Sequence, residues 1–127
     1  MEYKSQKYYY EFYYISVHNN RNLIQIEIQN HYVSLDNEEL LITLKGELNT
    51  TTAPELEKVI DADLKGVTTL IFEFADLRYL SSAGLRVLLV AQKIMNKQGK
   101  MIVRHPNEDV MDVFDITGFA NVLTIEN

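Results

Sequence analysis

The sequence predicts a single domain of the α/β class. Its 127 residues suit one domain of ordinary size, long enough to bury a hydrophobic core without disulfides or a structural metal. From residue 23 onward, runs rich in β-branched and aromatic residues alternate with amphipathic segments of about 10 to 16 residues, the pattern of strands alternating with helices. Hydrophobic residues make up 46% of the chain and charged residues 24%, which is the balance of a folded globular protein.

The first 22 residues differ in composition from the rest. Six of the eight tyrosines lie within the first 14 residues. Lys4, Lys7 and Glu11 interrupt this segment, so it lacks the apolar run of about 7 to 15 residues that a secretory signal needs. We predict a flexible, tyrosine-rich N-terminal extension over residues 1–22 and a domain over residues 23–127. An added strand, or a stretch translated from upstream of the natural start, is the alternative for the extension.

The domain is expected to begin with strands. Isoleucines at alternate positions over residues 24–28 predict a strand with one solvent-exposed face. This strand belongs either to the domain sheet or to the extension. Residues 32–35 form a second short extended run, followed by a turn at residues 36–37. Residues 39–48 are predicted to form the next strand.

The first helix has a clear start and a clear stop. Residues 52–55 fit a capping box, in which the Thr52 hydroxyl accepts a free amide while Glu55 reaches back to the cap. Apolar residues follow at helical spacing, and Gly66 marks the stop. These apolar residues are Leu56, Val59, Ile60 and Leu64. The next run, residues 67–74, is mostly apolar and β-branched or aromatic, which predicts a buried central strand.

The second half of the chain repeats this alternation. A helix opens at residues 81–84 and is followed by a strand over residues 100–104. Asn107 is predicted to cap a third helix, which Gly118 closes, and residues 121–126 form a final strand.

Composition and spacing exclude several classes of function. With 12 basic residues against 18 acidic ones, the formal charge is −6, so the chain is not expected to bind nucleic acid or an anionic membrane. Cysteine is absent, which excludes disulfides and thiolate chemistry and fits a reducing compartment such as the cytoplasm. The three histidines lack metal-ligand spacing, and there is neither a phosphate-binding loop ending in lysine nor a serine elbow. We therefore predict no catalytic residue, no metal and no cofactor.

The junction over residues 72–89 carries the strongest candidate site. A buried strand is expected to run into a loop, after which a helix opens at Ser81 and Ser82, and a helix N-terminus offers unpaired amides to an anion such as phosphate. Serine is also a favoured N-cap, so these serines have an ordinary structural interpretation as well. Gly84 costs a helix about 1 kcal/mol relative to alanine, which indicates that another backbone or a ligand approaches closely there.

The sequence at this junction resembles a known family. The segment YLSSAGLRVLL (residues 79–89) is similar to the signature loop of STAS domains, in particular the bacterial anti-sigma factor antagonists. LITLKGELNTTTAPEL before the first helix and VMDVFDITGFANVLTIEN at the end agree with that family, so the resemblance covers about residues 31–127. It implies a single STAS-type domain in which a mixed sheet of four to five strands is packed by three to four helices.

The resemblance also implies a switch and its partners. In this family the serine before the small-residue-Gly-Leu sequence is phosphorylated, which here is Ser82, with Ser81 as the alternative. The kinase is itself the anti-sigma factor: it binds the unmodified antagonist, which frees the sigma factor, and a metal-dependent serine phosphatase reverses the modification. The implied partner-binding residues are Asn49, Thr50, Thr51, Ser81, Ser82, Ala83, Gly84, Leu85 and Arg86. For Asn49, Thr50 and Thr51 the alternative is an ordinary polar connection between a strand and a helix. Ser81 and Asn49 stand where family members often have aspartate.

Two other functions are compatible with the same residues. The domain is alternatively a scaffold module that does not switch, in which the serines act only as caps. It is alternatively a small-ligand- or nucleotide-binding domain, since α/β folds often bind ligands at strand ends. The main interpretation is a cytoplasmic regulator that binds neither nucleic acid nor membrane.

Overall fold

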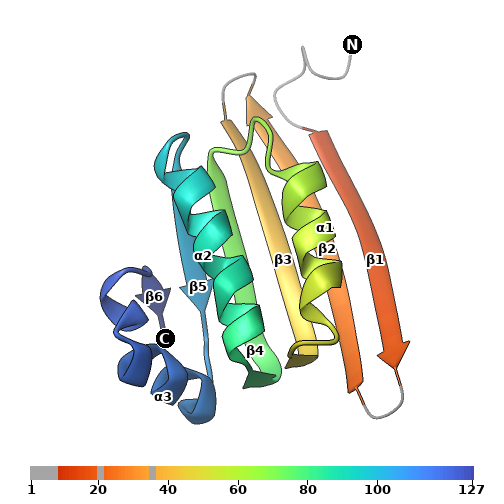
Figure 1. The fold of residues 1–127 in the computed structure, drawn as a ribbon. Helices are drawn as coiled ribbons and strands as arrows, with labels where there is room; N and C mark the ends of the chain where they lie inside the picture. The colour runs from red at the N-terminus through yellow and green to blue at the C-terminus, as the bar shows by residue number, and fades with distance from the viewer. Residues whose placement is uncertain (1–8, 20–21, 35–36) are drawn as a thin grey trace.

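The computed structural model describes residues 9–19, 22–34 and 37–127, and the side chains of residues 24–31 and 37–127. These residues form one mixed sheet with helices packed on it (Figure 1). The strands are β1 (Tyr9–Asn19), β2 (Asn22–Ser34), β3 (Asn37–Leu48), β4 (Thr69–Leu80), β5 (Lys100–Arg104) and β6 (Ile125–Glu126). The helices are α1 (Ala53–Asp63), α2 (Ser82–Asn96), α3 (Glu108–Thr117) and a 3₁₀ turn over Phe119–Asn121. The predicted α/β class is confirmed.

The six strands of the described sheet lie in the order in which they occur in the chain. β1, β2 and β3 form an antiparallel meander, whereas β3, β4, β5 and β6 run parallel to one another. Parallel neighbours need a crossover connection, and α1, α2 and α3 supply these connections in turn. Leu48 at the end of β3 pairs in register with Leu80 at the end of β4. The starts of α1 and α2 are therefore brought to the same edge of the sheet.

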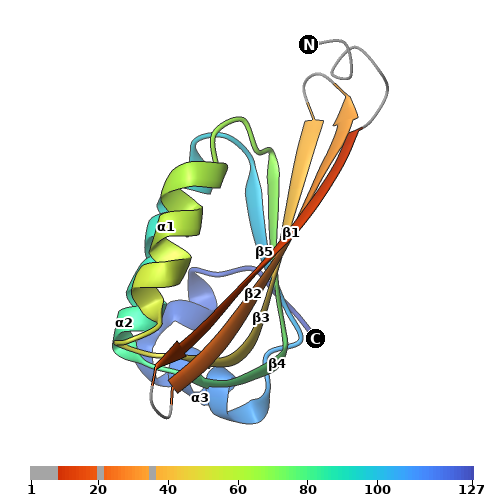
Figure 2. The same cartoon turned by 90° about the vertical axis from the view of Figure 1, so that its right-hand side faces the viewer.

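The core lies between one face of the sheet and the helices α1 and α2, which cover that face (Figure 2), and it includes Val110 and Phe114 of α3. Phe72 and Phe74 of β4 are fully buried, with ring centroids 5.8 Å apart, as expected for the predicted central strand. The loop expected after residue 74 is wrong, because β4 continues to Leu80 and leads directly into α2. Ile24, Ile26 and Ile28 are also fully buried. Burial of a side chain of this size stabilises the fold by about 1.5–3 kcal/mol, so β2 is an integral part of the domain sheet.

The N-terminal part of the sheet is larger than the sequence predicts. The resemblance implies four to five strands, and the described sheet has six because Tyr9–Asn19 pair with β2 along their whole length. Of the alternatives for residues 1–22, the structure has the added strand for this stretch rather than a flexible extension, and residues 1–8 and 20–21 lie outside the described residues. The expected short strand over residues 32–35 is instead the end of β2, which continues to Ser34. Of the expected turn at residues 36–37, residue 36 lies outside the described residues and Asn37 is the first residue of β3.

The C-terminal part follows the prediction more closely. Asn107 caps α3, with its side-chain oxygen accepting the Val110 N–H at 2.8 Å. Gly118, at a φ of +81°, ends that helix in the left-handed conformation that glycine tolerates best. The final strand is shorter than the predicted residues 121–126, because only Ile125–Glu126 pair with β5. Asn121 ends the 3₁₀ turn, and residues 122–124 belong to neither element.

Candidate functional site

The loop after β3 and the start of α2 are joined by a backbone hydrogen bond. The N–H of Ser81 donates to the carbonyl of Leu48 at 2.9 Å. Parallel pairing of β3 with β4 makes this bond possible, because it brings the ends of the two strands together. The structure therefore places the two predicted segments, residues 49–51 and residues 81–86, side by side.

The loop between β3 and α1 is held by its own side chains. The Asn49 side-chain oxygen accepts the N–H groups of Thr51 at 2.9 Å and Thr52 at 3.1 Å. The fully buried Thr52 hydroxyl accepts the Asn49 N–H at 2.9 Å and donates to the Glu47 carbonyl at 2.7 Å. Thr50 and Thr51 are left exposed on the outside of the loop.

The predicted capping box is therefore wrong. Thr52 precedes α1 as expected, but its side chain makes no hydrogen bond to the helix amides. The hydroxyl is turned toward β3, where it satisfies a carbonyl and an amide of the loop. Thr52 thus fastens the loop to the strand instead of capping the helix.

The two serines at the start of α2 have different roles. Ser81 is the N-cap: its backbone is extended, and its side-chain oxygen accepts the Gly84 N–H at 3.3 Å. Ser82 is the first helical residue, is exposed, and makes no side-chain hydrogen bond within the described part of the chain. Of these two serines, only Ser82 is exposed and has a hydroxyl without a hydrogen-bond partner among the described residues.

Gly84 is needed because α2 crosses very close to the end of β3. A Cβ at this position would lie 2.7 Å from Cγ of Leu48, 2.9 Å from its carbonyl oxygen and 2.9 Å from Cδ1 of Leu80. The close approach predicted from this glycine is confirmed, and the approaching group is backbone and side chain of the strands. Gly84 and Leu85 are both buried, so they support the site from below, whereas Ala83 is half-buried and Arg86 exposed.

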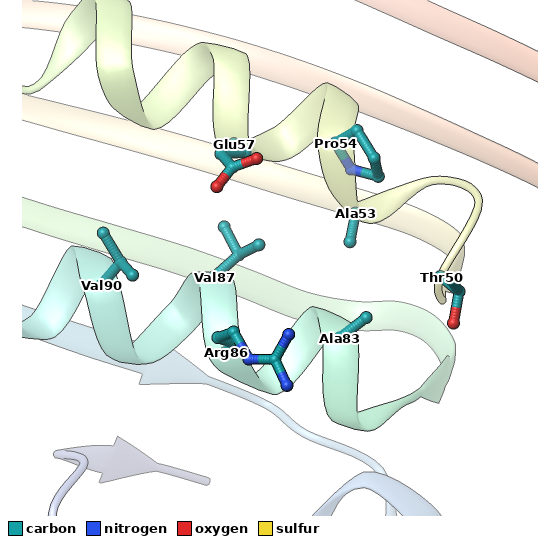
Figure 3. A pocket seen from close by; sticks show the side chains of 8 residues that line it. All are labelled: Thr50, Ala53, Pro54, Glu57, Ala83, Arg86, Val87 and Val90. Atoms are coloured by element: carbon teal, nitrogen blue, oxygen red, sulfur yellow. The ribbon is translucent and has the colours of Figure 1, made fainter.

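A groove runs between α1 and α2 beside the serines (Figure 3). Its volume is about 170 Å³. The lining residues are Thr50, Ala53, Pro54, Glu57, Ala83, Arg86, Val87 and Val90. Val90 is 40% exposed and leaves apolar side-chain surface at the groove.

The sequence predicts only part of this groove. Thr50, Ala83 and Arg86 were among the predicted residues, whereas the α1 side and the valines of α2 were not. A signal was present, since Ala83, Val87 and Val90 recur at i, i+4 and i+7 and form a second stripe beside the core stripe of α2. Which face such a stripe borders depends on where α1 packs, and that is a tertiary property.

Of the two arginines near the groove, one forms an ion pair and the other does not. Arg78, just before the serine junction, lies 3.7 Å from the carboxylate of Glu47. Arg86 has no ion-pair partner within the described residues, although Glu57 lines the same groove from α1. The groove thus offers an apolar floor with an unpaired guanidinium at its edge.

The residues that the structure describes contain no group of three or more histidine, aspartate or glutamate side chains arranged to hold a metal ion. In that same part of the chain, no helix has the length and apolar character needed to span a bilayer.

Known proteins resemble this chain over most of its length. The STAS domain family matches residues 24–127. A Bordetella bronchiseptica protein assigned as the anti-sigma factor antagonist BtrV is 36% identical over 90 residues, which span 69% of this chain and 78% of that protein. The anti-sigma-B factor antagonist of Listeria innocua is 26% identical over 106 residues, or 82% of this chain and 90% of that protein.

Solved structures share the fold. The anti-sigma factor antagonist SpoIIAA in its unphosphorylated form has a TM-score of 0.62 at 24% identity, covering 79% of this chain and 88% of its own. The phosphorylated form of the Bacillus protein SpoIIAA has a TM-score of 0.58 at 22% identity, covering 79% and 91%. The family match runs from β2 to the last residue and includes every element that builds the serine junction. This chain belongs to the STAS domain family.

Proposed function

We propose that this chain is an anti-sigma factor antagonist whose binding to its partner is switched by phosphorylation of Ser82. The unmodified protein binds an anti-sigma factor that is also a serine kinase, and the phosphorylated protein is released. Its role is regulatory, and it contributes no catalytic group of its own. The names of its relatives support the partner class, because BtrV and the Listeria protein are both described as anti-sigma factor antagonists.

The observation that carries this proposal is the difference between the two serines. A kinase must draw the acceptor hydroxyl into its own active site. Ser82 is exposed and its hydroxyl is not engaged within the described residues, whereas the Ser81 hydroxyl holds the first turn of α2 through Gly84. Modification of Ser81 therefore requires breaking the cap, at a cost of about 1 kcal/mol, and modification of Ser82 does not.

The chemistry is an ordinary phosphoryl transfer supplied by the partner. Oγ of Ser82 attacks the γ-phosphorus of ATP bound to the kinase, the bond to the β–γ bridging oxygen breaks, ADP leaves and the hydroxyl proton is lost. A metal-dependent serine phosphatase reverses the change by hydrolysis, which returns the serine and inorganic phosphate. The antagonist contributes only the position of its hydroxyl.

Phosphorylation changes the charge of the surface that the partner meets. A phosphoserine adds about −1.5 to −2 charges and three strong acceptor oxygens at the edge of the groove. Taking these charges out of water at a packed interface is costly unless the partner offers cations. A change from 99% to 1% bound needs about 5.5 kcal/mol of differential affinity, a size that one desolvated phosphate supplies. Release therefore needs no change in the fold of the antagonist.

The proposed partner surface combines the exposed residues around the groove. The exposed or half-buried members of the predicted set are Asn49, Thr50, Thr51, Ser81, Ser82, Ala83 and Arg86. Gly84 and Leu85 act from beneath by setting the course of α2. Because sigma factors act on RNA polymerase, the partner would meet this protein in the bacterial cytoplasm.

Phosphate mapping with the cognate kinase tests the proposal. The wild type, Ser82→Ala and Ser81→Ala are incubated with ATP and the anti-sigma factor kinase of the same organism, and the products are mapped by mass spectrometry. We expect one phosphate on the wild type and on Ser81→Ala, located at Ser82, and none on Ser82→Ala. Modification at neither serine, or retention of the phosphate in Ser82→Ala, would contradict the proposal. Modified protein that binds the kinase as tightly as unmodified protein would instead support the non-switching scaffold.

A further inference from the structure

Arg86 lies four residues after Ser82 on the same helix. Ser82 is the first residue of α2, so the two side chains share one helix face, with Cβ atoms about 5–6 Å apart. Helical side chains lean toward the N-terminus of their helix. Figure 3 shows this for Arg86, whose guanidinium extends back along α2 in the direction of Ala83.

The guanidinium is available for a new partner. It is exposed, and no carboxylate of the described residues lies within ion-pair distance of it. Glu57 borders the groove from α1, and the neighbouring cation Arg78 is already paired with Glu47. An anion N-terminal to a cation at i, i+4 is also the favoured orientation for a helical ion pair.

We propose that Arg86 binds the phosphate of phosphorylated Ser82 within the same helix, and so acts as the residue that responds directly to the modification. A guanidinium presents parallel N–H donors that match two phosphate oxygens. In the unmodified protein the Arg86 guanidinium lies unpaired at the mouth of the groove, where it can contact the partner protein. In the phosphorylated protein it is withdrawn into the pair. Phosphorylation then adds an anion to the docking surface and removes a cation from it in one step.

This inference rests on the proposed function in one respect only, the choice of Ser82 as acceptor. Its test is independent of any kinase. Phosphoserine is installed at position 82 during synthesis by an expanded genetic code, and the midpoint of the phosphate titration is followed by ³¹P NMR at low ionic strength. The comparison includes the otherwise unchanged chain, Arg86→Ala, Arg86→Lys and Lys93→Ala. Lys93 is the matched control, because it is an exposed cation in the last turn of α2 and lies about 16 Å from Ser82 along the helix axis.

A paired guanidinium favours the dianion and lowers the titration midpoint. We expect Arg86→Ala to raise it by about 0.4 pH unit, Arg86→Lys to restore part of that shift, and Lys93→Ala to leave it unchanged. An Arg86→Ala midpoint equal to that of Lys93→Ala overturns the role of Arg86 while leaving phosphorylation at Ser82 in place. Failure of the kinase to modify Ser82 is a separate result, since it overturns the acceptor assignment and not the ion pair.

Discussion

Gly84 of α2 and Leu48 of β3 are in such close contact that a single added methyl group would overlap both the side chain and the carbonyl of Leu48. This contact fixes how near the helix can come to the strand. It also fixes the position of Ser82 relative to β3, because Ser82 is two residues earlier on the same helical turn. The position of the exposed serine is thus set by a buried glycine.

We predict that Gly84→Ala destabilises the fold. Helix propensity alone favours alanine by about 1 kcal/mol, but forcing a methyl group into a filled core costs about 1–3 kcal/mol. The carbonyl of Leu48 is part of the sheet and cannot rotate away. The cost of the steric clash should therefore exceed the gain in helix propensity. Urea unfolding measures the difference. Arg86→Ala, a change at an exposed position of the same helix, should stay within about 0.5 kcal/mol of the wild type. A Gly84→Ala protein more stable than the wild type would show that the helix can move aside.

We predict that Thr52→Val costs about 1–3 kcal/mol of unfolding free energy. The substitution keeps the shape of the side chain but leaves the Glu47 carbonyl and the Asn49 N–H without their partner in a buried place. Thr52→Ser retains the hydroxyl and should lose less. Thr51→Val serves as the control, because Thr51 is exposed in the same loop. Equal stabilities for the valine and serine variants at position 52 would count against the hydroxyl as the fastener of the loop.

Substitutions of the two serines should have different effects on the free energy of unfolding, because the serines have different roles in the structure. Ser81→Ala removes the N-cap of α2 and is expected to lower the unfolding free energy by about 0.5–2 kcal/mol. Ser82→Ala removes only an exposed hydroxyl and should change it by less than about 0.5 kcal/mol. Thermal unfolding of the unmodified proteins is sufficient. The reverse order, with Ser82→Ala the weaker protein, would mean that Ser82 is the structural residue and would remove the basis for choosing it as acceptor.

The exposed valine of the groove should matter for binding and not for folding. We predict that Val90→Ser weakens binding to the anti-sigma factor by about fivefold to thirtyfold, because it removes apolar contact area at the groove. Ile116→Ser is the matched control: Ile116 is 86% exposed on α3, which takes no part in the groove. Isothermal titration calorimetry of the unphosphorylated proteins gives both affinities. Equal losses for the two variants would place the docking surface elsewhere.

Local patterns predicted the elements well where one signal dominated. The alternating isoleucines of β2, the cap at Asn107 and the end of α3 at Gly118 each depend on a residue and its near neighbours. The serine junction was found in the same way, because its small-residue-Gly-Leu sequence lies in one continuous segment. What these signals share is that the conformation is decided within a few residues of the chain.

The features that were missed depend on groups far apart in sequence or on competing partners. A threonine three residues before a glutamate has the same pattern whether its hydroxyl turns to the helix or to the preceding strand. At Thr52 the loop amide of Asn49 and the carbonyl of Glu47 decided the outcome. Likewise, Tyr9–Asn19 has a composition suited to a strand, but only the position of β2 beside it makes it the sixth strand.

The order of the strands has a consequence for how this domain can be altered. Since neighbours in the described sheet are also neighbours in sequence, its outermost strands are β1 and β6. Material can be fused to or trimmed from either end at the cost of one edge pairing, while the β3–β4 pair stays enclosed by strands on both sides. The surface that we propose for docking lies at the ends of β3 and β4, away from both outermost strands, so changes at the chain ends should leave it in place.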